Sequence, residues 1–151
     1  MRRPRVVFDA GVLVSALLGP DGPAGGLLRL FIERRAFDLV LTDAILDELR
    51  ESLADVEVQR HLGVSPESVE RWATALGLLA VHVSGEDGAA ALRVAADPGD
   101  DKYLTAALES GASMIISGDP HLLELGGRGG VEVVSPRVFL EVLELRAGQA
   151  V

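Results

Sequence analysis

The sequence predicts an α/β fold, a three-layer sandwich in which a five-stranded parallel sheet lies between helices. Short apolar runs alternate with longer segments of helical periodicity along all 151 residues, as in chains of βαβ units. Hydrophobic residues make up 48% of the chain but aromatic residues only 4%, so aliphatic side chains are expected to dominate the core. The length suits a single domain over residues 1–151.

The first half of the chain supplies two predicted strands and two predicted helices. Arg5–Phe8 and Phe37–Leu41 are short, rich in β-branched and aliphatic residues, and followed by polar residues, as buried strands are. Between them, residues 23–35 place leucine, phenylalanine and isoleucine at helical spacing. Asp43 is expected to cap a second helix that ends near Ala54.

The second half continues the alternation. Its expected elements are helices over 66–77, 97–110, 120–125 and 136–146, and strands over 78–83, 113–117 and 131–134. Ser65 and Pro66 mark a helix start, because serine caps helices and proline suits the first helical position. The glycine-rich segment 126–130 precedes a strand and lacks the Lys-Ser/Thr ending of a phosphate loop, so it is expected to be a flexible connection.

The composition excludes several kinds of site. There is no cysteine, which excludes disulfides, thiolate metal sites and a cysteine nucleophile. The arginines at positions 2, 3 and 5, followed by an apolar stretch to Leu18, imitate a signal peptide, but Asp9 interrupts the stretch and no small-residue cleavage pattern follows. We therefore expect a soluble cytoplasmic protein.

The charge of the chain argues against a nucleic-acid partner at first sight. The formal net charge is −9, whereas phosphate binding normally draws on a basic surface. A nucleic-acid partner would still be possible if several carboxylates converge on cations and if the arginines form a local basic patch. The arginines that could form such a patch are Arg2, Arg3, Arg5, Arg29, Arg34, Arg35, Arg128 and Arg137.

Two acids follow predicted strands directly. Asp9 comes after the strand that ends at Phe8, and Asp119 follows the strand over 113–117. Open α/β sheets bind ligands beyond the carboxyl ends of their strands, where the strand order reverses. Asp119 also precedes Pro120 and could simply cap a helix; the two roles are compatible.

The segment from Asp97 to Leu108 places acids on the apolar side of its helix. One helical stripe holds Asp97, Asp100, Asp101, Leu104, Ala107, Leu108 and Gly111. Acids in a first helical turn are favoured by the helix dipole, but this preference does not select a face. The position therefore favours a functional role for Asp101.

The remaining candidates are weaker on their own residues. Glu48 lies on the flank of an amphipathic helix, where a surface glutamate is the default. His61, His82 and His121 show no zinc-binding spacing. Carboxylates without histidine or cysteine suit Mg²⁺ or Mn²⁺, which take oxygen ligands. Because Mg²⁺ also bonds substrate phosphate, the chemistry indicated is phosphodiester cleavage.

Four motifs together resemble the PIN-domain family, in the branch of toxins related to the VapC ribonucleases of toxin-antitoxin systems. They are Asp-Ala-Gly-Val-Leu-Val-Ser-Ala over 9–16, Glu48-Leu49, Asp-Pro-Gly-Asp-Asp-Lys-Tyr-Leu over 97–104, and Ser-Gly-Asp over 117–119. Each motif is short and common, but four in this order and spacing are specific. The resemblance runs from Val6 to Phe139, nearly the whole chain.

The resemblance implies an acidic quartet that binds metal and catalyses the reaction: Asp9, Glu48, Asp101 and Asp119. It also implies that Ser117 helps to order the site and that Asp100 is an additional or substitute ligand. The implied cofactor is Mg²⁺ or Mn²⁺, the implied substrate is RNA, and the implied partners are a second copy of the chain and a cognate antitoxin.

Two alternatives compete with this interpretation. The family usually has Thr-Asn after its first aspartate, whereas this chain has Ala10-Gly11, so a PIN-like RNA-binding or partner-binding module with little or no catalysis stays open. A phosphoacceptor receiver domain would need an acid pair after the first strand and a lysine after the fifth. Asp9 stands alone, and residues 135–137 are Ser-Pro-Arg, so that fold is rejected.

Overall fold

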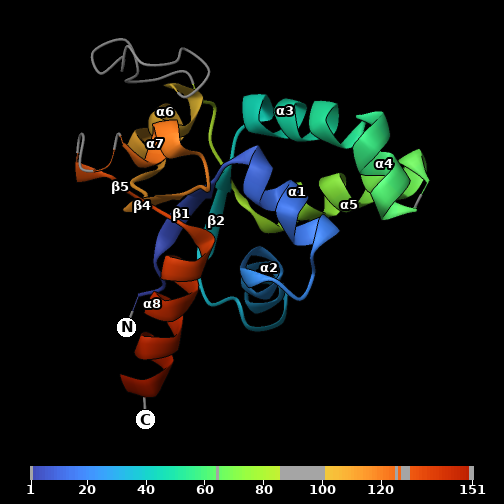
Figure 1. Ribbon diagram of the computed structural model, residues 1–151. Coiled ribbons are helices and arrows are strands. Elements are labelled where there is room, and N and C mark those ends of the chain that lie inside the picture. The colour runs from blue at the N-terminus through green and yellow to red at the C-terminus, as the bar shows by residue number, and fades with distance from the viewer. Residues whose placement is uncertain (1, 64, 86–100, 125, 127–129, 150–151) are drawn as a thin grey trace.

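Five parallel strands form the central sheet, in the order β3-β2-β1-β4-β5 (Figure 1). The strands are β1 (Arg5–Phe8), β2 (Asp38–Leu41), β3 (Val81–His82), β4 (Met114–Ile116) and β5 (Glu132–Val134). This computed structural model describes the chain except for residues 1, 64, 86–100, 125, 127–129 and 150–151. The α/β class with a five-stranded parallel sheet is thereby confirmed.

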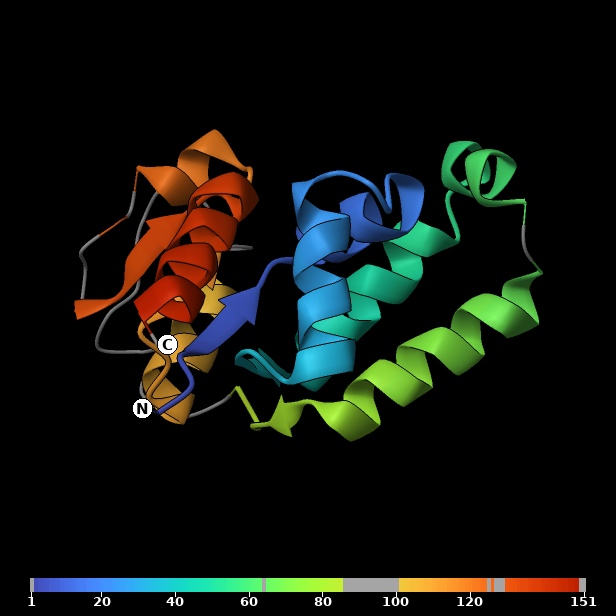
Figure 2. The ribbon, with the colours of Figure 1, turned by 90° about the horizontal axis from the view of Figure 1, so that it is seen from below.

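Helices surround the sheet. They are α1 (Ala10–Leu18), α2 (Pro23–Arg34), α3 (Asp43–Leu53), α4 (Val56–Leu62), α5 (Pro66–Leu79), α6 (Asp101–Ser110), α7 (Pro120–Leu123) and α8 (Pro136–Gln149). Helix α6 packs on β1, β2 and β4, whereas α2 packs between α1 and α8. In Figures 1 and 2, α4 lies at the end of the molecule away from β5. No described helix is long and apolar enough to cross a membrane.

The strand order places a switch point at the middle of the sheet. From β1 the chain steps to β2 and β3 on one side, and it later returns to add β4 and β5 on the other. Strands β1 and β4 are hydrogen-bonded neighbours with Phe8 paired to Ile116, so their carboxyl ends lie side by side. Chain segments that follow these two strands therefore meet.

All four phenylalanines of the chain pack together and tie α2 and α8 to the sheet. The ring of Phe37 lies 5.4 Å from Phe8, 5.4 Å from Phe31 and 5.2 Å from Phe139, measured between centroids. Each of the four side chains is almost fully buried, and such aromatic contacts add to the stabilisation from area burial alone.

Several expected boundaries were wrong. Thr42, not Asp43, caps α3: its hydroxyl accepts a hydrogen bond from the Ile45 amide at 3.1 Å. Helix α5 runs through Gly77 to Leu79, so the strand expected over 78–83 shrinks to two residues. Gly77 is tolerated there because Leu76 is buried in the core and anchors the last helical turn.

Helices α1 and α4 were not anticipated. In α1 the side chains of Val12, Leu13 and Ala16 are buried while Val14 and Leu17 are partly buried against the core, so no polar face reveals the helical period. Helix α4 has no buried residue, which removes the apolar stripe by which it could be recognised.

Candidate active site

Two acids lie at the switch point of the sheet. Asp9 directly follows β1, and Asp119 comes shortly after β4. Since β1 and β4 are parallel neighbours, both carboxylates project from the same edge of the sheet. Asp9 also caps α1, and its Oδ1 accepts a hydrogen bond from the Val12 amide at 2.7 Å.

Ser117 joins the two segments that carry these acids. Its hydroxyl donates to Asp9 Oδ2, and its oxygen accepts a hydrogen bond from the Asp119 amide at 2.9 Å. Ser117 is 0% exposed and Asp9 is 7% exposed, so water competes little for either contact. The Asp9 carboxylate is therefore fixed on one side by α1 and on the other by Ser117.

Asp119 has a capping role as well as a place in the site. Its Oδ1 accepts a hydrogen bond from the His121 amide at 2.9 Å and so caps the short helix α7. The same residue lines the cavity that Asp9 lines. Asp119 can therefore cap α7 and line the cavity at the same time.

Glu48 reaches the site from α3, where it is held by two neighbouring residues of α6. The Tyr103 hydroxyl donates to Glu48 Oε2 at 2.7 Å, and the Lys102 ammonium forms an ion pair with the same oxygen. The Tyr103 oxygen also accepts a hydrogen bond from the Ala10 amide at 3.2 Å. A single buried hydroxyl thus links α3, α6 and the start of α1.

Tyr103 is the site residue that reasoning from the sequence missed. It is the only tyrosine in the chain, and it is 3% exposed. A buried tyrosine usually finds a partner for its hydroxyl, so its position two residues after Asp101 was a usable signal.

The three acids face one open cavity of about 420 Å³. Its lining residues are Asp9, Gly11, Val12, Ser15, Glu48, Tyr103, Gly118, Asp119, Leu122 and Pro136. They come from α1, α3, α6, the segment after β4, α7 and the start of α8. Residues spread over much of the chain therefore meet at the switch point.

The fourth predicted acid is placed only through its backbone. Helix α6 begins at Asp101, directly before Lys102 and Tyr103. The side chain of Asp101, and all of Asp97 and Asp100, lie outside the described part of the structure.

Comparison with known proteins identifies the family. The PIN domain family profile matches residues 5–121, most of the chain. The chain belongs to the PIN domain family. A relative from Methanocaldococcus jannaschii, described as "Uncharacterized protein MJ1680", is 27% identical over 148 residues, which cover 93% of this chain and 92% of the relative.

A solved structure shares the fold of this PIN domain. The chain is similar to one in the crystal structure of VapBC2 from Rickettsia felis bound to a DNA fragment from their promoter, with a TM-score of 0.62 and 9% sequence identity. The match covers 87% of this chain and 98% of the other. At this identity the likeness is one of fold.

Burial and charge act on the Asp9 carboxyl of the PIN domain in the same direction. Burial raises the pKa of Asp9 above its ordinary value, and the nearby charges of Asp119 and Glu48 raise it further. The hydrogen bonds from Ser117 and Val12 oppose this increase but do not cancel it. A cation bound in the cavity would favour the ionised form and offset the cost of burying it.

Tyr103 is held in its protonated form. Burial is the largest cause and raises the pKa of its hydroxyl; the hydrogen bond from the Ala10 amide lowers this pKa, and Glu48 raises it again. At neutral pH the hydroxyl therefore keeps its proton and donates a hydrogen bond to Glu48.

The oxygen donors of the cavity suit a hard cation, although the described side chains do not yet lie close enough to bind one together. Within the described residues, which leave out the Asp101 side chain, no three acidic or histidine side chains are close enough to hold a metal ion. Asp9, Glu48 and Asp119 nevertheless share one cavity and offer only oxygen donors, the ligands that Mg²⁺ and Mn²⁺ prefer.

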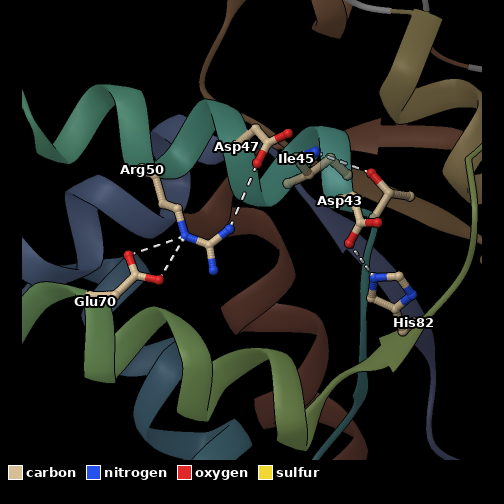
Figure 3. Close-up of polar contacts among 7 residues, drawn as sticks. Asp43, Ile45, Asp47, Arg50, Glu70 and His82 are labelled. Carbon is tan, nitrogen blue, oxygen red and sulfur yellow. Dashed lines mark hydrogen bonds and ion pairs between the residues drawn. The ribbon is translucent and has the colours of Figure 1, made fainter.

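Asp43 shows which acids at this edge do not belong to the site. It lies beyond the carboxyl end of β2, but its Oδ1 pairs with His82 Nε2 of β3 at 3.0 Å, at the start of α3 (Figure 3). Its side chain is 85% exposed, and it is absent from the cavity lining. An acid after a strand is therefore not sufficient; the strand must flank the switch point.

Proposed function

We propose that this PIN domain is a metal-dependent ribonuclease that cleaves RNA phosphodiester bonds. Its catalytic and metal-binding acids would be Asp9, Glu48, Asp101 and Asp119. The observation that carries the proposal is the meeting of three of these acids, from elements far apart in the sequence, in one cavity at the switch point.

Mg²⁺ or Mn²⁺ would be held by these carboxylates, with Asp100 as an additional ligand. When bound, such a cation stabilises negative charge on phosphate oxygens and favours attack by water at neutral pH. The protein's share is to supply oxygen donors of fixed orientation in one cavity.

The neighbours of the acids would act by positioning them. Ser117 and the Val12 amide keep Asp9 from rotating, and Tyr103 and Lys102 direct Glu48 towards α6. Lys102 is the only lysine in the chain, and its ammonium offsets part of the negative charge at the site. Outer contacts of this kind are typically worth 10–100-fold in metal affinity or activity.

The proposed biological role is that of the toxin in a toxin-antitoxin pair. Membership of the PIN domain family and the fold shared with a chain of the VapBC2 structure support it. A cognate antitoxin would then be the controlling partner, the active form would be a homodimer, and the RNA substrate would be met in the cytoplasm.

The direct test is cleavage of single-stranded RNA by the purified chain. We expect cleavage with Mn²⁺, none with excess EDTA, and none by Asp9→Asn. Asp43→Asn is the matched control, since it removes the same charge from the same edge but outside the cavity. Equal activity in parent, Asp9→Asn and Asp43→Asn would show that the cleavage comes from a contaminant or from another site.

A second candidate function is a PIN-like module that binds RNA or a protein without cleavage. Gly11 favours it, because this residue lines the cavity without a side chain beside Asp9, where the family usually has asparagine. A Cβ built on Gly11 would lie 3.3 Å from Asp9 Oδ1, so a side chain there would contact the acid. Mn²⁺ binding without any RNA cleavage would favour this candidate.

A further inference from the structure

A cluster of arginines occupies the end of the sheet opposite the active site. We call it the arginine edge; its members are Arg2, Arg3, Arg5, Arg34 and Arg146. These residues line two adjoining cavities of about 840 and about 370 Å³. Arg2, Arg3 and Arg146 line both cavities, so the two form one continuous basic surface.

The arginine edge is built by the amino ends of neighbouring strands. Arg5 begins β1, Asp38 begins β2, and Ser113 precedes β4; all three line the larger cavity. The start of the chain lies beside α8 in Figures 1 and 2, and the Arg146 guanidinium donates to the Arg2 carbonyl at 3.4 Å. The edge is therefore assembled by the fold from both ends of the sequence.

Positive charge exceeds negative charge at this surface. Among the described residues that line the two cavities, five are arginines and only two are acidic, Asp38 and Glu144. Asp38 is shared by Arg3 at 3.1 Å and Arg5 at 3.8 Å. A locally basic surface on a chain with a formal net charge of −9 concentrates cationic side chains where a polyanion can use them.

The chemistry of the edge suits phosphate. A guanidinium presents a planar fork of donors that matches phosphate oxygens, and several forks in a row match a repeated phosphate. Between the arginines the lining is aliphatic, with Pro4, Leu30 and Leu143, which offers apolar contact to sugars and bases.

The distance between the two ends of the sheet is short. Strand β1 has four residues and runs from Arg5 to the residue before Asp9, so its rise separates the two ends by only about 13 Å. Because β1 itself is buried, a strand of nucleic acid that contacts both the arginine edge and the acidic cavity must pass around the sheet over the surface of the molecule.

We propose that the arginine edge binds the phosphate backbone of the RNA strand that the acidic cavity would cleave. The identity of this polyanion rests on the proposed function. An acidic cavity repels a free RNA strand, so most of the affinity comes from the basic end, and the acidic end acts on the segment delivered to it.

The test measures binding without cleavage. A fluorescent single-stranded RNA of roughly 16 nucleotides, the upper range of single-strand binding sites, is titrated with the full chain in EDTA and followed by anisotropy. Arg34→Gln combined with Arg146→Gln removes two arginines of the edge. Arg60→Gln combined with Arg71→Gln is the matched control, because it changes the net charge equally on α4 and α5, away from the edge.

The edge variant should bind the RNA about tenfold more weakly or worse, and the control pair should bind as the parent does. The dependence of log Kd on log salt should fall in slope by about 1.4 in the edge variant, since each lost phosphate contact on a single strand accounts for about 0.7. In the cleavage assay the edge variant should raise KM and leave kcat unchanged. If both variants bind RNA equally more weakly than the parent, the proposal is overturned, because the change in net charge would then explain the loss of affinity.

Two further outcomes separate this proposal from the proposed function. If the parent binds RNA through the arginine edge but cleaves none, the nuclease assignment fails and the edge stands. If the parent cleaves RNA and the edge variant binds and cleaves as the parent does, the edge proposal is wrong. The edge proposal is also wrong if the edge variant binds RNA as the parent does but binds poly-glutamate, a model of an acidic protein, more weakly. The surface would then bind an acidic protein.

Discussion

The two ends of one short sheet carry opposite charge. At the carboxyl ends of β1 and β4, the acids Asp9, Glu48 and Asp119 face one cavity; at the amino ends of the same strands, the arginine edge lines another surface. The acids are buried or half-buried and held by specific hydrogen bonds. The arginines of the edge that can be compared are about half exposed, with side-chain exposures of 52% for Arg3 and 42% for Arg5.

This difference teaches that a net charge says little about where a chain can bind a polyanion. The value of −9 averages over a surface whose two ends differ in sign. A parallel sheet makes the separation possible, because all its strands begin at one edge and end at the other. The acidic end is expected to set kcat and the basic end KM.

The largest effect is expected from removing acids of the cavity. Asp9→Asn should lower the rate of RNA cleavage in Mn²⁺ by at least about 10³-fold, and adding Glu48→Gln should make it scarcely worse, because members of one catalytic assembly are strongly non-additive. Single-turnover cleavage of a labelled RNA measures both. If Glu48→Gln alone cleaves as fast as the parent, Glu48 is not a member of the quartet.

Tyr103→Phe should have the next largest effect. It removes the hydroxyl that donates to Glu48 and accepts from the Ala10 amide, so Mn²⁺ affinity and cleavage should each fall about 10–100-fold. Isothermal titration with Mn²⁺ gives a readout independent of activity.

Ser110→Ala is the control for Tyr103→Phe. It removes another buried hydroxyl of α6, one that donates to the Ala107 carbonyl at the far end of the helix. It should lower stability without changing Mn²⁺ affinity. If both variants lose affinity alike, the effect of Tyr103 is on the fold and not on Glu48.

A moderate effect is expected from metal on thermal stability. Mn²⁺ at a hundredfold excess over Kd should raise the Tm of the parent by roughly 5–10 °C, by mass action on the folded state. The gain should vanish in Asp9→Asn and persist in the Arg34→Gln and Arg146→Gln variant, as measured by differential scanning calorimetry. A gain that survives Asp9→Asn would place the cation elsewhere.

The smallest expected effect is a stabilisation by Asp9→Asn in the absence of metal. The pKa of Asp9 is raised in the folded state, so the ionised carboxyl lowers the free energy of unfolding at neutral pH. This loss of stability disappears below pH 3.8, the ordinary pKa of an aspartate. In EDTA the variant should therefore be more stable than the parent at pH 7 and equal to it near pH 3. Chemical denaturation at the two pH values checks this, and a less stable variant at pH 7 would contradict it.

The sequence predicted the parts of the fold that local chemistry decides. Strand β1 has its expected bounds of Arg5–Phe8, since a short apolar run between polar residues is typical of a buried strand. Helix α2 begins at Pro23 as expected, because proline suits a first helical turn. Asp9 and Asp119 could be placed near each other because parallel strands end at a common edge, whereas Ser117 was implied only by the resemblance to the family.

Local chemistry did not decide between neighbours of equal propensity. Thr42 and Asp43 are both good caps, and the structure uses Thr42 because its side chain points inward at 1% exposure, while Asp43 turns outward to His82. Likewise Gly77 was expected to end α5, but the packing of Leu76 in the core carries the helix past it.

The sequence by itself determined the order of the five strands and of every described helix except α1 and α4, and it placed Asp9 and Asp119 beyond the ends of their strands. Only the tertiary structure decided that Tyr103 joins Glu48 to the start of α1 and that Arg146 lies beside Arg2. The physical reason is that such contacts join residues 55 to 144 positions apart in the sequence. They depend on how helices pack on the sheet, which no local pattern of propensity or periodicity records.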